Sequence, residues 1–197
     1  MVPAENQQRE GPLPSPSGGT YTYADCLSWG EEVRAEIIDG EIVMTAPPMR
    51  RHQEISRNLF LKIGNFLEGK PCRLYAAPFA VRIFPRPDNS DHTVLEPDLV
   101  VVCDSAKLDD RGCNGPPDLI VEILSPTTAH LDSGVKFRAY LQAGVREYWI
   151  VDGDAKTVHA GVLHANQYLV SVYDETQTAP VTVLPPCRIE LRSVFAG

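Results

Sequence analysis

The sequence lacks several features that would assign a function class at once. It has no uninterrupted apolar run of about 18 residues, so no segment is predicted to span a membrane. The first 19 residues contain no apolar stretch typical of a secretion signal, and the five histidines show no HExxH spacing. These absences argue against a membrane protein, a secreted protein and a zinc hydrolase of that type.

Cysteine and basic residues are also sparse. The five cysteines are odd in number, widely spaced and without a CxxC pair, so neither a disulfide framework nor a thiolate zinc site is predicted. A reducing, cytoplasmic location fits this pattern best. The 18 basic against 26 acidic residues give a net charge of -8, which disfavours a protein that coats nucleic acid non-specifically. A local basic patch that binds DNA remains compatible with this charge.

The length and composition predict one folded domain. With 197 residues, 43% hydrophobic and 22% charged, the chain can bury one sizeable core. Residues 1–20 are rich in Pro, Gly, Ser and Gln and are predicted to be a disordered leader. The domain is therefore expected over residues 21–197.

Local patterns predict the elements of this domain. Residues 21–32 are expected to form a short helix that places Leu27 and Trp29 in the core. An Asp-Gly pair between apolar runs predicts a hairpin over residues 35–45. Apolar residues at steps of three and four predict an amphipathic helix over residues 51–69. Further expected elements are strands over residues 73–84, 98–104, 118–124 and 146–151, a helix over 131–143, and an exposed antiparallel hairpin over 156–173. The strand, helix, strand order after residue 118 predicts a right-handed crossover.

One acidic residue interrupts an apolar strand. The segment "PDLIVEILSP" is typical of a strand buried on both faces, yet Glu122 stands in its middle. An ionised carboxylate removed from water needs a cation, a proton or a solvent-filled cleft. Glu122 is therefore the first candidate functional residue.

The same strand pattern occurs twenty residues earlier. "PDLVVV" from Pro97 matches "PDLIVE" from Pro117. If the two strands pair antiparallel with opposed positions that sum to 220, Asp98 faces Glu122, with Cβ atoms about 5 Å apart. Two such carboxylates repel each other, and a divalent cation such as Mg²⁺ or Mn²⁺ would relieve the repulsion.

Several segments resemble a known family. The order of elements is similar to the PD-(D/E)XK nuclease core, and "EIIDGEIVMTAPP", "RRHQEISRNL", "EPDLVVV", "GPPDLIVEILSPTT" and "DSGVKFRAYLQAGVREYWIVD" resemble the Uma-two family of restriction-endonuclease-like proteins. The resemblance covers roughly residues 20–170. It implies an α/β fold with a restriction-endonuclease-like core, in which helices flank a mixed central sheet, with N-terminal and C-terminal β-hairpins. It also implies a metal-dependent DNA endonuclease that acts as a homodimer, with Asp98 and Glu122 as its catalytic acids.

The sequence departs from the superfamily pattern at Leu124, where a lysine is expected. On the following helix, Asp132, Lys136 and Tyr140 lie at i, i+4 and i+8 and share one face. The resemblance implies that the catalytic lysine has moved to Lys136, where it would orient or deprotonate the attacking water. Asp98, Glu122 and the Ile123 carbonyl are the expected metal ligands.

Each assignment has a structural alternative. Glu122 could form a buried ion pair with Lys136 or an arginine, and Asp98 could be a strand-entry residue. Asp132 and Lys136 could be an exposed i,i+4 pair. Glu36 and His52 could face the cleft or be ordinary cap or surface residues. The basic residues Arg50, Arg51, Arg57 and Lys62 could contact phosphates or form a solvated face. A catalytically degenerate protein that uses this fold for binding or assembly is the alternative function.

Overall fold

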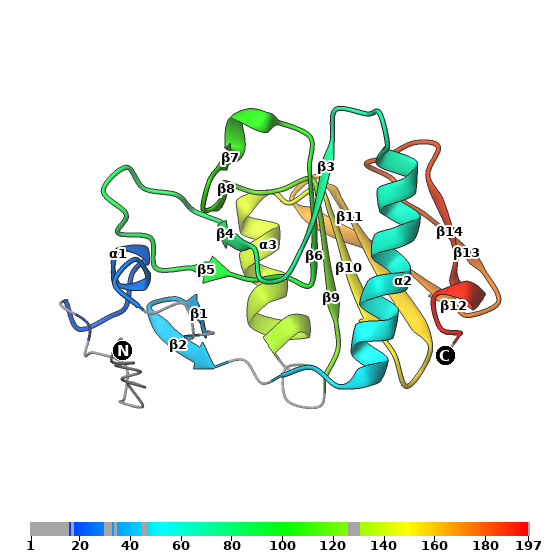
Figure 1. Ribbon diagram of the computed structural model, residues 1–197, viewed down its shortest axis with the longest axis horizontal. Coiled ribbons are helices and arrows are strands. Elements are labelled where there is room, and N and C mark those ends of the chain that lie inside the picture. Colours follow the sequence, from blue (N-terminus) through cyan, green and yellow to red (C-terminus); the bar gives the residue numbers. More distant parts are fainter. Residues whose placement is uncertain are drawn as a thin grey trace, which may run out of the picture.

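Two six-stranded mixed sheets form the framework of the chain (Figure 1). The computed structural model describes residues 16, 18–29, 33, 35–44, 47–125 and 131–196. The predicted leader lies outside these residues, apart from residues 16 and 18–20. None of the helices within the described ranges is long and apolar enough to cross a membrane.

The central sheet carries the strands that the sequence analysis singled out. Its order is β12-β11-β10-β9-β6-β3, with β9 and β10 parallel and the other pairs antiparallel. The strands are β3 (Arg73–Ala76), β6 (Leu99–Val102), β9 (Leu119–Ile123), β10 (Glu147–Asp152), β11 (Thr157–His164) and β12 (Gln167–Asp174). Every residue of β6 and β9 is buried, as expected for strands covered on both faces.

The second sheet holds the N-terminal hairpin. Its order is β2-β1-β5-β4-β8-β7. The strands are β1 (Ala35–Ile38), β2 (Glu41–Met44), β4 (Ala80–Arg82), β5 (Val94–Leu95), β7 (Leu108–Asp109) and β8 (Gly112–Asn114). A separate two-stranded sheet pairs β13 (Thr178–Pro180) with β14 (Arg188–Glu190).

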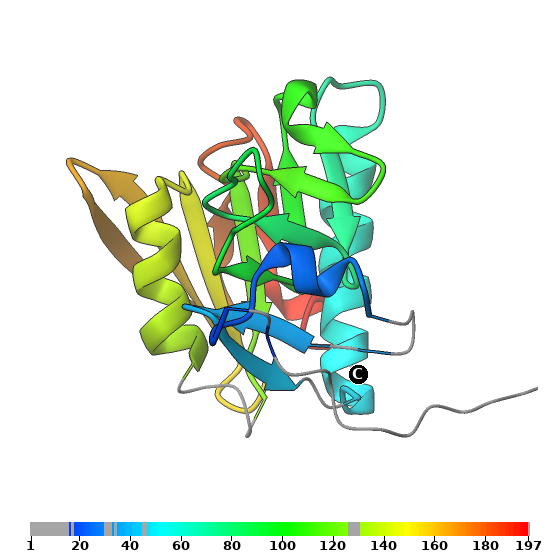
Figure 2. The same cartoon turned by 90° about the vertical axis from the view of Figure 1, so that its left-hand side faces the viewer.

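Helices cover both faces of the central sheet (Figure 2). The α2 helix (Arg50–Leu67) buries Ile55, Leu59 and Ile63 against the odd-numbered residues of β6 and β9. On the opposite face, a π-helix (Leu131–Lys136) leads into α3 (Phe137–Ala143), which packs against the even-numbered residues. The other described helices are short: α1 (Tyr23–Cys26) and the 3-10 turns Ser105–Lys107 and Leu191–Ser193.

Predictions that rest on turn chemistry and periodicity are confirmed. The β1–β2 hairpin turns at Asp39 and Gly40, whose φ values are +52° and +82°. The strand pairs Leu99–Val121, Val100–Ile120 and Val101–Leu119 have the register that was assumed, with positions that sum to 220. The crossover from β9 through α3 reaches β10 in parallel, and β11 and β12 form the C-terminal hairpin.

Three other predictions are wrong. Leu27 is 41% exposed and not in the core, whereas Trp29 does pack in a small N-terminal cluster. Residues 73–84 form two strands in different sheets, because Pro78 lacks the N–H that a continuous ladder needs. Cys72 and Cys103 form a disulfide, since they flank the paired ends of β3 and β6 although 31 residues apart.

Candidate active site

The register of β6 and β9 brings two predicted acids to neighbouring chain positions. Asp98 directly precedes β6, and continuation of the register places it across from Glu122. Its Oδ2 accepts a hydrogen bond of 2.7 Å from the backbone N–H of Ile123. Asp98 is thereby held against the strand that carries Glu122.

Glu122 is buried but has two polar partners. The Nζ atom of Lys136 lies 3.1 Å from Glu122 Oε1, and the Tyr140 hydroxyl donates to the same oxygen at 2.7 Å. Both partners come from the helical segment that covers this face of β9. An ammonium group therefore lies next to Glu122, on a residue fourteen positions along the chain, although position 124 holds a leucine.

Two further carboxylates surround the same ammonium. Glu36 reaches it from β1 at 2.8 Å, and Asp132 lies 3.4 Å from it within the π-helix. Glu36 also accepts a bond of 2.8 Å from the backbone N–H of Glu96. Glu36, Glu122, Asp132 and Lys136 are each at most 4% exposed. We call these four residues the Lys136 cluster.

The excess of negative charge in this cluster stabilises the charged form of Lys136 and destabilises the charged form of Glu122. Burial works against the Lys136 ammonium, but the three carboxylates outweigh it and raise its pKa well above the ordinary value. Burial and the charges of Asp132, Glu36 and Asp98 raise the pKa of Glu122, and Lys136 offsets only part of this. Burial likewise raises the pKa of Tyr140. Lys136 therefore remains a cation at neutral pH, which argues against its predicted alternative role as a base that deprotonates water.

His52 approaches the acids from the opposite face of the sheet. Its Nε2 atom, on the first turn of α2, lies 3.2 Å from Asp98 Oδ2. Burial disfavours the imidazolium, but the hydrogen bond and charge of Asp98 prevail and raise the pKa of His52. The Nδ1 atom is buried and has no hydrogen-bond partner within the described part of the chain. His52 thus faces the site, and the surface reading of this residue is wrong.

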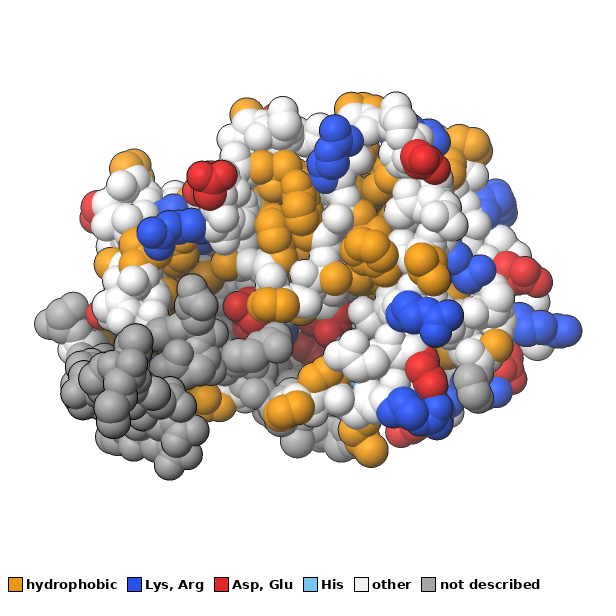
Figure 3. Space-filling view, in the orientation of Figure 1, with side chains coloured by type: hydrophobic (Ala, Val, Ile, Leu, Met, Phe, Trp, Pro, Cys, Tyr) orange, Lys and Arg blue, Asp and Glu red, His pale blue; other side chains and the backbone are white. Residues whose placement is uncertain are grey.

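A cavity lies beside the first turns of α2 and borders His52 and Ile123. The cavity has a volume of about 340 Å³, and its lining includes His52, Ile123, Leu124 and residues 152–154. Arg51 and Ile55 line it as well, and both also line a neighbouring pocket of about 260 Å³. In Figure 3, acidic side chains gather in the hollow near the centre of the face shown.

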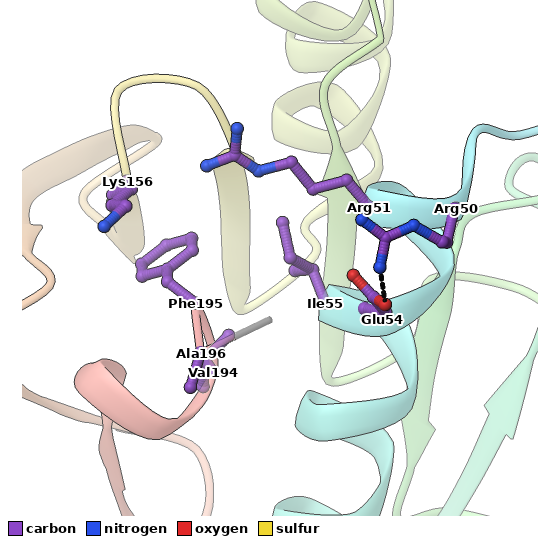
Figure 4. Close-up of a pocket in the computed structure, with 8 residues that line it drawn as sticks. All are labelled: Arg50, Arg51, Glu54, Ile55, Lys156, Val194, Phe195 and Ala196. Atoms are coloured by element: carbon purple, nitrogen blue, oxygen red, sulfur yellow. Dashed lines mark hydrogen bonds and ion pairs between the residues drawn. The ribbon is translucent and has the colours of Figure 1, made fainter.

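The neighbouring pocket has an apolar floor and a basic rim (Figure 4). Ile55 and Phe195 face each other across it, and the side chains of Arg50, Arg51 and Lys156 surround them. Arg50 pairs with Glu54 at 2.5 Å, and Arg51 lies 3.2 Å from Asp154. Arg57 and Lys62, the other members of the predicted basic strip, do not line this pocket.

The donor set of the site suits a hard divalent cation. Within the described residues, the hydrogen bonds of Asp98 use Oδ2 and those of Glu122 use Oε1, so one carboxylate oxygen of each could bind a metal ion. No group of three or more His, Cys, Asp or Glu side chains in the described ranges forms a metal cluster by itself. Mg²⁺ commonly binds through one or two carboxylates and keeps several waters, so two acids are sufficient. The surplus of carboxylates over ammonium groups also favours a second cation.

Comparison with known proteins places the chain in a family. Residues 23–192 match the model of the Uma2 family, described as putative restriction endonuclease, and the chain belongs to this family. An uncharacterized protein of Synechocystis is 28% identical over 174 residues, which cover 85% of this chain and 83% of the relative. A crystal structure of a putative nuclease from Anabaena variabilis superposes with a TM-score of 0.71 at 21% identity. The superposition covers 89% of this chain and 97% of the other.

These comparisons confirm the predicted family and fold class. The fold of two mixed sheets flanked by helices is similar to the fold of the Anabaena structure. The family description supports a nuclease class for this protein.

Of the sequence-predicted site residues, the structure brings together Glu36, Asp132, Lys136 and Tyr140 around Glu122, and it places His52 against Asp98. Of these contacts, the one between Glu36 and Lys136 was the hardest to predict from the sequence. The sequence marks Glu36 only as an acidic residue next to two isoleucines in the predicted hairpin strand.

Proposed function

We propose that this protein is a metal-dependent endonuclease that hydrolyses phosphodiester bonds in DNA. The observation that carries the proposal is the position of Lys136, which lies beside Glu122 although Leu124 occupies the expected lysine position. Glu122 on β9, Asp98 across from it and the Lys136 ammonium then lie close together, and the adjacent residues Ile123 and His52 line the cavity.

Lys136 is suited to an electrostatic role. Because its pKa is raised, it carries a charge throughout the neutral range and can stabilise the negative charge that develops on a phosphate in the transition state. In the hydrolysis, water oxygen bonds to phosphorus, one P–O bond to the sugar breaks, and the leaving oxygen takes up a proton. Tyr140 holds the Glu122 carboxylate through a 2.7 Å hydrogen bond, which limits the orientations of that side chain.

Asp98, Glu122 and the Ile123 carbonyl are the residues that would hold Mg²⁺ or Mn²⁺. Such a metal ion would polarise a phosphate oxygen and offset its charge. His52 would fix the orientation of Asp98 by its contact with Oδ2, as outer partners of metal ligands commonly do.

The basic rim beside the cavity supports DNA as the substrate. Arg51 lines both the cavity next to His52 and the pocket that contains Arg50 and Lys156. A DNA backbone that enters the cavity would pass these side chains, and most protein contacts to DNA are made to phosphates. The net charge of -8 makes this local strip more important, since the protein as a whole carries an excess of negative charge.

A plasmid-nicking assay with Mg²⁺ or Mn²⁺ tests the proposal. Wild type should nick or cut DNA, and Asp98→Asn and Glu122→Gln should each reduce the rate to background. Asp118→Asn is the matched control, because Asp118 also follows a proline and precedes a central strand but pairs with Arg146 at 2.8 Å. Equal loss of activity in all three variants, or no cleavage by wild type with any divalent metal, would contradict the proposal.

A binding or assembly scaffold is the second candidate. The contacts of Lys136 with three buried carboxylates, at 2.8 to 3.4 Å, favour it, because they also describe a structural ion-pair network. Metal binding separates the candidates: a scaffold of this kind would show no saturable heat of Mn²⁺ binding that Asp98→Asn and Glu122→Gln remove.

A further inference from the structure

We propose that the outer edge of β12 is the contact surface of a symmetric homodimer, in which two central sheets join into one. The family resemblance implied a homodimer but did not locate its interface. Strand β12 is at one end of the central sheet, and among the strands of the described residues it pairs with β11 alone. The β11–β12 hairpin projects beyond α3, which leaves room for a second copy (Figure 2).

Exposed apolar side chains are concentrated on this strand. Leu169, Val170 and Val172 are 53%, 49% and 55% exposed, and they are three of the nine large hydrophobic residues that are exposed in the described ranges. Exposed apolar residues so close together commonly mark a contact surface. The only charged residue of β12 is Asp174, at its end.

The opposite edge strand of the same sheet, β3, has features that commonly prevent pairing with a strand of another molecule. Strand β3 has only four residues, its first residue is the exposed Arg73, and Pro71 and Pro78 flank it. Strand β12 has eight residues that pair with β11 without a bulge. A long, regular edge without Lys, Pro or a bulge is an available template for another strand.

The hairpin geometry shows which backbone groups of β12 face outward. The loop Ala165–Asn166 has two residues with φ of +47° and +62°, so the closing pair His164–Gln167 is hydrogen-bonded across the hairpin. Alternation then directs the N–H and C=O groups of Tyr168, Val170 and Val172 away from β11. The bond from Leu163 N to Arg146 O agrees with this alternation, because Leu163 is opposite Tyr168 and bonds on the β10 side.

A two-fold axis at Val170 would pair these outward backbone N–H and C=O groups with the same groups of a second copy. It would also place compatible side chains opposite each other. Antiparallel pairing of two copies would oppose Val170 to Val170 and Tyr168 to Val172, with about six backbone hydrogen bonds. Leu169 would oppose Ser171, and no like charges would meet. The strand is therefore complementary to a second copy of itself.

The joined sheet would also set the distance between the two candidate active sites. Only this part of the proposal rests on the proposed function. Strands β9 of the two copies would be seven strand spacings apart, which is about 34 Å before twist. One turn of DNA is also about 34 Å, so the two sites could meet one face of a duplex at positions one turn apart.

Sedimentation velocity on the full chain without metal or DNA tests the interface. Wild type at about 50 µM should sediment as a dimer, at twice the 21.7 kDa chain mass. V170K should dissociate the dimer at least about tenfold more readily, since two lysines would meet at the axis. V170T retains the branched shape and should remain dimeric.

L61K is the matched control for the alternative surface on α2. Leu61 is 47% exposed, and its substitution should leave the dimer intact. A monomeric wild type, a dimer that V170K does not weaken, or a dimer that L61K weakens instead would each overturn the proposal. Because the measurement needs no cleavage, a protein that dimerises but does not cut DNA would contradict only the proposed function.

Discussion

Two buried ion-pair sites in this protein differ in their balance of charge. Asp91 is fully buried and receives two bonds from one guanidinium, at 3.1 Å from Arg82 Nε and 2.6 Å from Nη2. Arg82 also donates to Asn114 and to the Arg86 carbonyl, and its guanidinium lies over the Tyr23 ring. In this pair one cation faces one anion, and further hydrogen bonds occupy the guanidinium.

The Lys136 cluster instead places one ammonium among three carboxylates, with Asp98 close enough to affect Glu122. A buried excess of charge is costly, so it is found where a ligand or reaction makes use of it. The Arg82–Asp91 pair holds β4, β8 and the segment before β5 together and needs no further ion. Charge balance, more than burial, therefore distinguishes the Lys136 cluster from the Arg82–Asp91 pair.

The largest expected effect is on catalysis. Lys136→Met should lower the cleavage rate by about a hundred- to a thousandfold, because the charge that stabilises the transition state is lost. Metal affinity should change little, which calorimetry with Mn²⁺ would show.

Lys107→Met is the control, since Lys107 donates to the Pro116 carbonyl and not to a site residue. Some loss of stability in Lys136→Met is expected under either function, because three carboxylates lose their partner. Near-normal cleavage by Lys136→Met would show that the cluster is structural, like the Arg82–Asp91 pair.

For the Arg82–Asp91 pair, we expect a loss of stability without a loss of activity. Asp91→Asn should lower the free energy of unfolding by about 3 kcal/mol, because it leaves a largely buried guanidinium without its counter-charge. The cleavage rate of the folded protein should remain that of wild type. Denaturant unfolding and a nicking assay measure the two quantities, and a variant that is stable but inactive would reverse our comparison.

The burial of Glu122, together with the carboxylates around it, predicts a pH effect of intermediate size. Since the pKa of Glu122 is raised on folding, the folded state binds more protons than the unfolded state above pH 4.5. Stability without metal should therefore fall as pH rises from about 4.5 toward 8, by at most about 1.4 kcal/mol per unit for one group.

Glu122→Gln should flatten this dependence, and Mg²⁺ should restore the stability of wild type at pH 8. Potassium at equal ionic strength is the control for screening. Thermal unfolding across this pH range checks the result, and identical profiles for wild type and Glu122→Gln would contradict a charge surplus at this residue.

The smallest expected effect concerns the exposed basic rim. Arg51→Gln should weaken DNA binding about fivefold and reduce the slope of log affinity against log salt by about one, because one phosphate contact is lost. Arg111→Gln, on the turn between β7 and β8, should leave both quantities unchanged. Fluorescence anisotropy at several salt concentrations makes the measurement, and equal effects in the two variants would mean that Arg51 contributes only to the general charge.

Local features of the sequence were enough to predict much of the fold. The Asp39–Gly40 turn, the apolar face of α2 and the repeated PDL pattern depend on residues within a few positions of each other. The repeat suggested a register between β6 and β9 that was assumed, and the structure confirms it. The positions of Asp98 and Glu122 on neighbouring strands were thus predicted from the repeat together with this assumed register.

Contacts between distant segments were decided only by the tertiary structure. Glu36 and Lys136 are 100 residues apart, and they meet because the β1–β2 hairpin packs over the π-helix end of the crossover. The contact of His52 with Asp98 and the Cys72–Cys103 disulfide likewise depend on how α2 and β3 pack beside β6. Periodicity and turn chemistry determine which face of an element is apolar, whereas the identity of its neighbour depends on the packing of the whole chain.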